Sequence, residues 1–178
     1  AVVLESLEHA LERGATVLAE ITGFGSTGDA YHMTAPEPSG EGVARAMRQA
    51  LEEGGFTPDD LGHLNAHGTG TPANDATESK ALLALCGEEA GSRIPVTSVK
   101  GTTGHTLGAA GAIEAIVTAL SVMNDCVPPT AGFAEADPEC PVSVVIEAKT
   151  GYPQKVALSN SLGFGGHNAS LALSPYRA

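Results

Sequence analysis

Three side chains capable of acid–base chemistry stand close together in SVKGTTGHTLGAAGAIEAIVTALSVM, from Ser98 to Met123. Lys100 and His105 precede a run of small and aliphatic residues, and Glu114 lies within that run, where a buried helix is expected. A lone buried carboxylate is costly unless a partner neutralises it. We therefore expect Glu114 to pair with Lys100, partly as a structural ion pair and partly to fix the turn that aims His105.

His105 is expected at the N-terminus of that apolar helix. The positive end of a helix dipole disfavours the imidazolium, so the ring should be neutral there. A neutral imidazole can donate a hydrogen bond to an oxygen on which negative charge develops during a reaction. His105 is therefore a candidate catalytic donor.

A second candidate, His67, occurs in HLNAHGTGTP, where a strand is expected to give way to a loop. Proteins of the α/β class place reactive groups at such strand ends. His63 precedes His67 by four residues, which is metal-ligand spacing on a helix, but the segment is typical of a strand and disfavours a metal site. Thr69 and Thr71 offer hydroxyls that could hold the polar end of a ligand. A purely structural histidine is the alternative for an isolated ring.

The glycine pattern GFGSTG, Gly23 to Gly28, matches the G-x-G-x-x-G pattern of dinucleotide-binding loops. Such a loop needs a helix that begins at the third glycine, where the helix N-terminus holds the pyrophosphate. The residues after Gly28, DAYHMTAPEPSG, do not favour a helix. We expect instead a turn with positive φ or a close backbone approach.

Strands and helices alternate along the chain, which predicts an α/β fold with a mixed sheet covered by helices. Asn74 or Asp75 is the expected cap of the helix that begins at Pro72. Helices are predicted over 6–14, 41–55, 72–87 and 107–123. Strands are predicted over 2–4, 15–25, 61–68, 94–99, 141–148, 154–161 and 168–174.

The composition excludes several classes of partner. The chain has 178 residues, of which 42% are hydrophobic and 17% charged, as expected of a folded globule. Its net charge is -12, and the nine Lys and Arg residues are scattered, which disfavours nucleic acid and anionic membrane surfaces. The apolar run 107–123 is short and contains Glu114, so it does not indicate a membrane span.

Cysteine usage points to a reducing, cytoplasmic environment. Cys86, Cys126 and Cys140 are odd in number and widely spaced, which disfavours a disulfide framework or a zinc ribbon. The chain opens on AVVLES, which is typical of a strand, and we expect it to be a piece of a longer protein.

Six motifs together resemble the β-ketoacyl-acyl-carrier-protein synthases, the condensing enzymes of fatty-acid and polyketide synthesis. The resemblance covers essentially the whole chain, fits the C-terminal half of such an enzyme, and is strongest to the discrete bacterial elongating type. The motifs, in order, are GDAYHMTAP from Gly28, NAHGTGTP from Asn65, SVKGTTGHTLGAAGAIE from Ser98, VPPT from Val127, DPEC from Asp137 and NSLGFGGHN from Asn160.

The resemblance implies a thiolase-type fold, in which two similar halves pack into five layers, α-β-α-β-α. This chain would form a thiolase-like half with a mixed five-stranded sheet and covering helices. Residues 1–14 would end the N-terminal half, and residues 15–178 would form the C-terminal half.

The resemblance also implies a reaction. In the family a cysteine accepts an acyl group from a carrier protein, malonyl-carrier protein loses carbon dioxide, and the resulting carbanion attacks the acyl thioester. His67 and His105 match the two histidines that hydrogen-bond the malonyl thioester carbonyl. Lys100 matches the lysine near the second histidine, and Glu114 matches the acidic partner of that lysine.

Substrate-binding residues follow from the same motifs. Thr69 and Thr71 match hydroxyls that contact the phosphopantetheine arm, and Phe164 matches the phenylalanine that gates the pocket. Thr34 and Gly165, from the motifs beginning at Gly28 and Asn160, are further substrate-binding candidates. No cofactor or metal is expected, because the phosphopantetheine arrives on the carrier protein.

Two departures from the family pattern matter. Leu162 replaces an aromatic residue of the gate, so gate motion and chain-length preference are expected to differ. None of Cys86, Cys126 and Cys140 falls in a family motif as nucleophile, so the nucleophile is expected from an N-terminal half outside this chain.

The implied partners are acyl carrier protein, that N-terminal half, and a second subunit in a homodimer or heterodimer. One alternative function is a non-catalytic subunit that determines chain length, although retention of His67, His105 and Lys100 argues against it. Another is a thiolase or other acyltransferase of the same fold, which NAHGTGTP disfavours.

Overall fold

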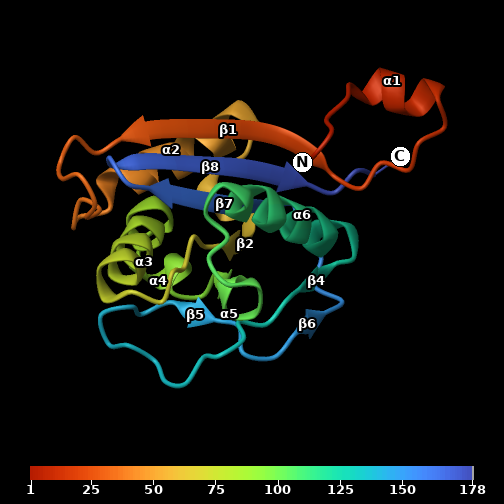
Figure 1. The fold of residues 1–178 in the computed structure, drawn as a ribbon. Helices are drawn as coiled ribbons and strands as arrows, with labels where there is room; N and C mark the ends of the chain where they lie inside the picture. The colour runs from red at the N-terminus through yellow and green to blue at the C-terminus, as the bar shows by residue number, and fades with distance from the viewer. Residues whose placement is uncertain (178) are drawn as a thin grey trace.

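Six strands form one mixed sheet in the order β1-β8-β7-β2-β3-β5 (Figure 1). The computed structural model describes residues 1–177. Strand β8 runs antiparallel to both of its neighbours, whereas β7, β2, β3 and β5 are parallel to one another. The strands are β1 Glu20–Gly28, β2 Leu61–Asn65, β3 Pro95–Thr97, β5 Ser143–Val144, β7 Val156–Gly163 and β8 His167–Ser174.

The sheet has one strand more than the five expected. The edge strand β5 pairs with β3 through only two residues, so the strand predicted over 141–148 is mostly irregular. Two further short strands, β4 (Cys126–Val127) and β6 (Lys149–Thr150), pair with each other in a separate sheet.

Helices cover both faces of the main sheet. Helix α6 crosses in front of the strands in Figure 1, and α2 lies behind them. The helices are α1 Leu7–Glu12, α2 Glu41–Glu53, α3 Pro72–Cys86, α4 Glu88–Gly91, α5 Lys100–Thr103 and α6 Ala110–Met123, with 3-10 turns at Pro58–Asp60 and Leu107–Ala109. The α/β class is confirmed.

Two further sequence predictions are wrong at the level of secondary structure. Val2 to Leu4 form no strand, and the side chain of Val3 is 91% exposed, because no described strand pairs with this segment. The helix predicted over 107–123 does not begin at Leu107. That residue has φ +52, a conformation that an α-helix does not contain, so a 3-10 turn precedes α6.

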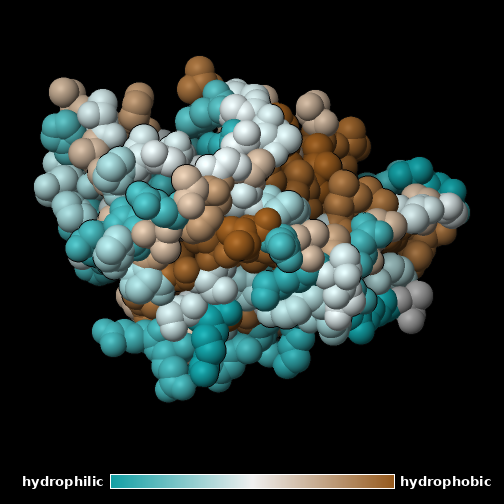
Figure 2. Space-filling view, turned by 90° about the horizontal axis from the view of Figure 1, so that it is seen from below, coloured by the Kyte–Doolittle hydropathy of each residue, from teal (hydrophilic) through white to brown (hydrophobic). Residues whose placement is uncertain are grey.

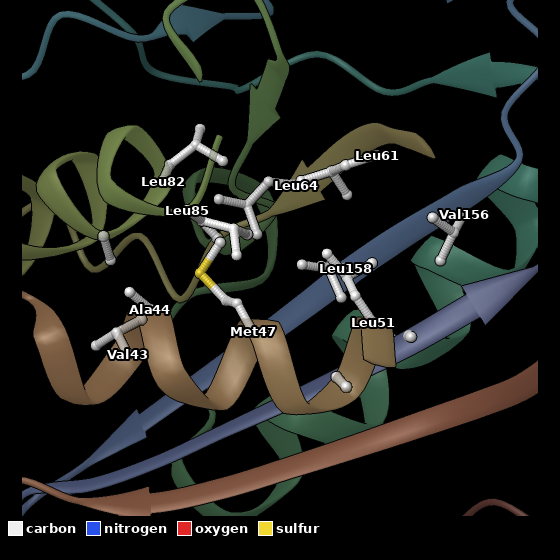
Figure 3. Close-up of a cluster of buried hydrophobic side chains, with 14 of the residues drawn as sticks. Val43, Ala44, Met47, Leu51, Leu61, Leu64, Leu82, Leu85, Val156 and Leu158 are labelled. Carbon is white, nitrogen blue, oxygen red and sulfur yellow. The ribbon is translucent and has the colours of Figure 1, made fainter. Parts of the chain in front are cut away.

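The hydrophobic core lies between the sheet and the α2/α3 layer (Figure 3). Met47 and Leu51 of α2 and Leu82 of α3 are almost completely buried there against Leu64 of β2 and Leu158 of β7. These positions repeat at helical spacing in the sequence, which is why the helices form with one apolar face toward the strands.

The GFGSTG glycines allow β1 to lie directly on α2. A Cβ atom on Gly23 would stand 2.0 Å from the carbonyl oxygen of Ala50, and one on Gly25 would stand 1.8 Å from that of Ala46. Gly28 ends the strand, and an irregular loop, not a helix, follows it. The interpretation as a close backbone approach is therefore confirmed.

Helix α6 turns polar residues toward the sheet. Glu114, Thr118 and Ser121 are buried on its inner side. Ile116 and Leu120, on its outer side, are 45% and 43% exposed. Within residues 1–177, every helix is too short or too polar to span a lipid bilayer.

Candidate active site

His67 follows strand β2, and a buried carboxylate holds its backbone. Glu78 of α3 accepts the His67 N–H at 2.9 Å through Oε1 and the Gly68 N–H at 2.7 Å through Oε2. The side-chain amides of Asn74 and Asn160 donate to the same carboxylate at 3.0 and 3.4 Å. Burial raises the pKa of Glu78, while these four donors act in the opposite direction. The clamp fixes the point at which β2 becomes the loop.

Lys100 joins the two histidine-bearing loops to α6. Its Nζ donates to Glu114 Oε1 and to the carbonyl oxygen of His67, and it lies 3.3 Å from His67 Nδ1. Lys100 is 8% exposed and Glu114 only 1%. The predicted pairing of Lys100 with Glu114 in a buried site is confirmed, and the lysine also contacts His67 directly.

The contact with Lys100 favours one tautomer of His67. An ammonium group has no acceptor, so Nδ1 of His67 accepts and the ring proton lies on Nε2. Burial, followed by the charges of Lys100 and His105, lowers the pKa of His67 to about 4. His67 is therefore a neutral imidazole near pH 7 with one free donor, Nε2–H.

His105 does not lie at the start of α6, as had been expected. It lies in the exposed turn between α5 and the 3-10 turn, and its Nδ1 accepts the Leu107 N–H at 3.3 Å. Because Nδ1 accepts this hydrogen bond, the ring proton lies on Nε2. The dipole of α6 is not needed to explain it. The rings of His67 and His105 meet edge to face with centroids 5.2 Å apart and an interplanar angle of 81°.

A cleft of about 800 Å³ adjoins these groups. Thr69, Lys100 and His105 line one part of it, and Phe133 and Ile146 line another. Figure 2, which views the molecule from below, shows hydrophobic residues exposed in the middle of the surface and hydrophilic residues around them. The cleft therefore offers polar groups beside the histidines and an apolar wall beyond them.

The remaining substrate-binding candidates divide into two places. The hydroxyls of Thr69 and Thr71 hydrogen-bond to each other at 2.8 Å, next to the cleft. Gly165 donates its N–H to the carbonyl of Met33 at 2.7 Å, which joins the loop of Phe164 to the loop of Thr34. These two loops contribute no residue to the lining of the cleft, and Phe164 is 78% exposed.

His63 has a structural environment. It is fully buried, its Nε2 lies 2.8 Å from Thr97 Oγ1, and burial lowers its pKa to about 3. Across residues 1–177, no three His, Cys, Asp or Glu side chains gather in a way that could hold a metal ion.

The expected cap of α3 is wrong. The helix begins at Pro72 after Thr71, so Asn74 and Asp75 lie inside its first turn. The side chain of Asn74 bonds to Glu78 instead of to the free helix N–H groups, because Glu78 lies one turn along the same buried face.

Sequence reasoning missed Glu78 and Asn65. Glu78 shares a face of α3 with Ala81, Leu82 and Leu85, and a carboxylate in an apolar helical stripe could have marked it as buried. Asn65 gave no such signal, because a single asparagine at a strand end is ordinary. In the structure it bonds to α6.

The surroundings of two cysteine thiols, Cys86 and Cys140, do not activate them. Burial raises the pKa of Cys86 to about 11, and it raises the pKa of Cys140 as well. All three cysteines are unpaired in the part of the chain described.

Comparison with known proteins supports one family. The model of the family described as "Beta-ketoacyl synthase, C-terminal domain" matches residues 18–134. The "3-oxoacyl-[acyl-carrier-protein] synthase 2" of Staphylococcus aureus (strain COL) is 50% identical over 176 residues, which are 99% of this chain and 42% of that protein. The protein of the same name from Synechocystis sp. (strain ATCC 27184 / PCC 6803 / Kazusa) is 47% identical over 175 residues, 98% of this chain and 42% of that protein.

Solved structures agree in fold. "The ishigamide ketosynthase/chain length factor" superposes with a TM-score of 0.90 at 41% identity, over 97% of this chain and 42% of that one. "AntDE:AntF (apo): type II PKS acyl-carrier protein in complex with its ketosynthase bound to the hexaketide" gives a TM-score of 0.91 at 37% identity, with the same two coverages. The chain spans about two-fifths of the length of the curated relatives it matches. The chain has a thiolase-like ketosynthase fold and belongs to the β-ketoacyl synthase family, through that family's C-terminal domain.

Proposed function

We propose that this chain supplies the histidine-bearing half of the active site of a β-ketoacyl-acyl-carrier-protein synthase. The observation that carries the proposal is the pair of adjacent imidazoles, His67 and His105, whose Nδ1 atoms both act as acceptors. Each ring is left with Nε2–H as a donor. Two such donors can converge on one thioester oxygen.

The chemistry follows from that arrangement. When the malonyl group loses carbon dioxide, the electron pair of the broken C–C bond moves to the thioester oxygen as an enolate. Hydrogen bonds from two neutral donors stabilise this charge without giving up a proton. The carbanion then attacks the acyl thioester carbonyl, a C–C bond forms, and the thiolate of the nucleophilic cysteine leaves.

Lys100 and Glu114 keep His67 in the donating tautomer. The ammonium group occupies Nδ1 and the backbone carbonyl of His67, and the carboxylate compensates its charge. We assign the binding of the phosphopantetheine arm to the hydroxyls of Thr69 and Thr71, and the gate of the substrate pocket to Phe164. Gly165 and Thr34 are assigned to substrate binding. The phosphopantetheine belongs to the carrier protein, so the site needs no cofactor or metal of its own.

We assign the nucleophile to an N-terminal half. Thiolate is the reactive form of cysteine, and burial raises the pKa of both Cys86 and Cys140. Residues 1–14 would end that half and residues 15–178 would form the C-terminal half. The exposed apolar side of α6 would lie against it. The complete enzyme would be a cytoplasmic homodimer or heterodimer that accepts acyl carrier protein.

His105→Ala in the complete enzyme tests the proposal. Carbon dioxide release from malonyl-carrier protein is expected to fall about 10²-fold or more, the cost typical of a lost oxyanion donor. His9→Ala, which removes an exposed histidine on α1, is the control. Carbon dioxide release at the wild-type rate in His105→Ala would contradict the proposal and would favour a non-catalytic chain-length-determining role.

A further inference from the structure

Polar side chains of β2 and the loop after it meet polar side chains of α6 in three steps. At the first step His63 Nδ1 lies 3.4 Å from Ser121 Oγ. At the second, Asn65 Nδ2 lies 3.0 Å from Thr118 Oγ1. At the third, Lys100 bridges the other two residues: its Nζ lies 3.3 Å from His67 Nδ1 and donates to Glu114 Oε1. All of these side chains are buried.

The spacing of the three steps matches the geometry of the two elements. Two residues of a strand advance about 6.6 Å, and three or four residues of a helix advance about 4.5–6 Å. The residues at 63, 65 and 67 therefore stay level with those at 121, 118 and 114 as the helix runs antiparallel to the strand. A slip of one helical turn would move Glu114 by about 5.4 Å, well beyond the reach of a hydrogen bond from Lys100.

The middle step is a set of three linked hydrogen bonds, which leaves the buried Oδ1 of Asn65 without a partner among the described residues. Thr118 Oγ1 donates to the carbonyl oxygen of Glu114 at 2.8 Å, so its oxygen is free to accept from Asn65. Asn65 Nδ2 donates both to Thr118 Oγ1 at 3.0 Å and to the Glu114 carbonyl at 3.1 Å. The amide of Asn65 and the hydroxyl of Thr118 both donate to the backbone carbonyl of Glu114, the residue whose carboxylate holds Lys100.

We propose that Asn65 and Thr118 are positioning residues that set the height of α6 on β2. They thereby hold the Glu114 carboxylate where it keeps Lys100 against Nδ1 of His67. The functional meaning of this inference depends on the proposed function, but its geometry does not. Apolar contacts alone would leave this height loosely defined, because hydrophobic attraction has no direction, whereas hydrogen bonds weaken steeply when misaligned.

The inference is tested by an NMR titration of His67 in Thr118→Val, which removes the hydroxyl and keeps the shape of the side chain. With Glu114 displaced, Lys100 loses its counter-charge and either leaves the site or gives up its proton. The pKa of His67 should then rise from about 4 by about 1 unit, as expected when a charge within about 4–6 Å is lost.

Two matched variants separate positioning from general loss of structure. Thr118→Ser restores the hydroxyl and should return the pKa of His67 to its wild-type value. Ser170→Ala removes a buried hydroxyl of β8 that takes no part in the three steps, and should leave the pKa of His67 unchanged. If Thr118→Val does not fold, Thr118→Ala takes its place. A His67 pKa that is unchanged in the hydroxyl-free variant, or that moves equally in Ser170→Ala, would overturn the inference.

A kinetic measurement on the complete enzyme distinguishes this inference from the proposed function. Thr118→Val should lower kcat for carbon dioxide release and move the acidic limb of the pH profile upward, with KM unchanged. If the pKa of His67 moves while carbon dioxide release does not, the positioning role stands and the proposed function is wrong.

Discussion

The two faces of the sheet are built from opposite kinds of side chain. The face covered by α2 and α3 is packed with fully buried aliphatic residues, among them Met47, Leu64 and Leu82. The face covered by α6 is held by buried polar residues, among them Asn65 and Glu114. Side chains on both faces are buried, but burial has different consequences on the two faces.

Because of this difference, one face contributes most of the stability of the fold, and the other determines the geometry of the site. Apolar burial contributes about 25 cal/mol per Å² and tolerates small displacements. Buried polar groups contribute little net stability, yet they are costly when a partner is lost. Apart from Glu78, which holds the backbone of His67 and Gly68, the α2/α3 face supports the fold, whereas the α6 face fixes the site although it contributes less to the fold.

The largest effect should come from unpairing the polar face. Glu114→Gln leaves the ammonium group of Lys100 buried without a counter-charge and should lower the free energy of unfolding by about 3–5 kcal/mol. Urea denaturation measures the change. Glu89→Gln, which breaks the exposed pair with Arg93, should cost about 0–1 kcal/mol. If the two variants were equally stable, Glu114 would not be buried as the structure shows.

A large effect of a different kind is expected on the apolar face. Met47→Ala should lower the free energy of unfolding by about 2–5 kcal/mol, because it leaves a cavity against Leu64 and Leu85. The pKa of His67, measured by NMR in the folded variant, should not change. Met33→Ala, at an exposed methionine, is the control and should be nearly neutral. A shift of the His67 pKa in Met47→Ala would show that the two faces do not act separately.

Sequence predicts the apolar face better than the polar one. The sequence located α2 and α3 within two residues at each end, α2 from hydrophobic residues that repeat every turn and α3 from the proline at its first position. It failed at the 3-10 turn before α6, where Leu107 adopts a positive φ that no pattern of residue types signals. It also overestimated the strand over 141–148, since pairing of an edge strand depends on neighbours that are distant in the chain.

The ion pair of the site was predictable, because a buried charge is costly without a partner of opposite charge. The cost of burying Glu114 pointed directly to Lys100, and the structure pairs them. Nothing comparable marked Asn65 or Thr118, because their hydrogen bonds join residues 53 positions apart. The turn of His105 was expected at a helix end, whereas a side-chain contact to Leu107 orients it, which only three-dimensional geometry reveals.

An intermediate effect should follow from the close contact of β1 with α2. Gly25→Ala places a Cβ atom 1.8 Å from the carbonyl oxygen of Ala46, so the helix must shift on the apolar face. We expect a loss of about 1–3 kcal/mol in the free energy of unfolding, typical of overpacking. Gly28→Ala is the matched control, because its Cβ would meet no atom within 4 Å. Equal stability of the two variants would rule out the close approach as the reason for the glycine pattern.

The last effect concerns pH and separates the two faces without altering a contact of the apolar core. His63 has a pKa of about 3 in the fold against an ordinary value of 6.5, and burial is the cause. Between these two values the unfolded chain binds a proton that the folded chain does not. The contribution of His63 therefore keeps the free energy of unfolding at its highest above pH 6.5. It lowers that free energy by about 1.4 kcal/mol per pH unit as the pH falls toward 3. The side chains that contact the ring, Thr97 and Ser121, do not titrate in this range.

His63→Gln should thus show a shallower decline in the free energy of unfolding between pH 6 and 4, measured by urea denaturation. His67 titrates in the same range but contributes equally to both proteins. Met47→Ala should lower the whole curve and keep the wild-type slope. Parallel curves for wild type and His63→Gln would mean that His63 is already protonated in the fold, and the polar face would then not be the dry environment that the structure describes.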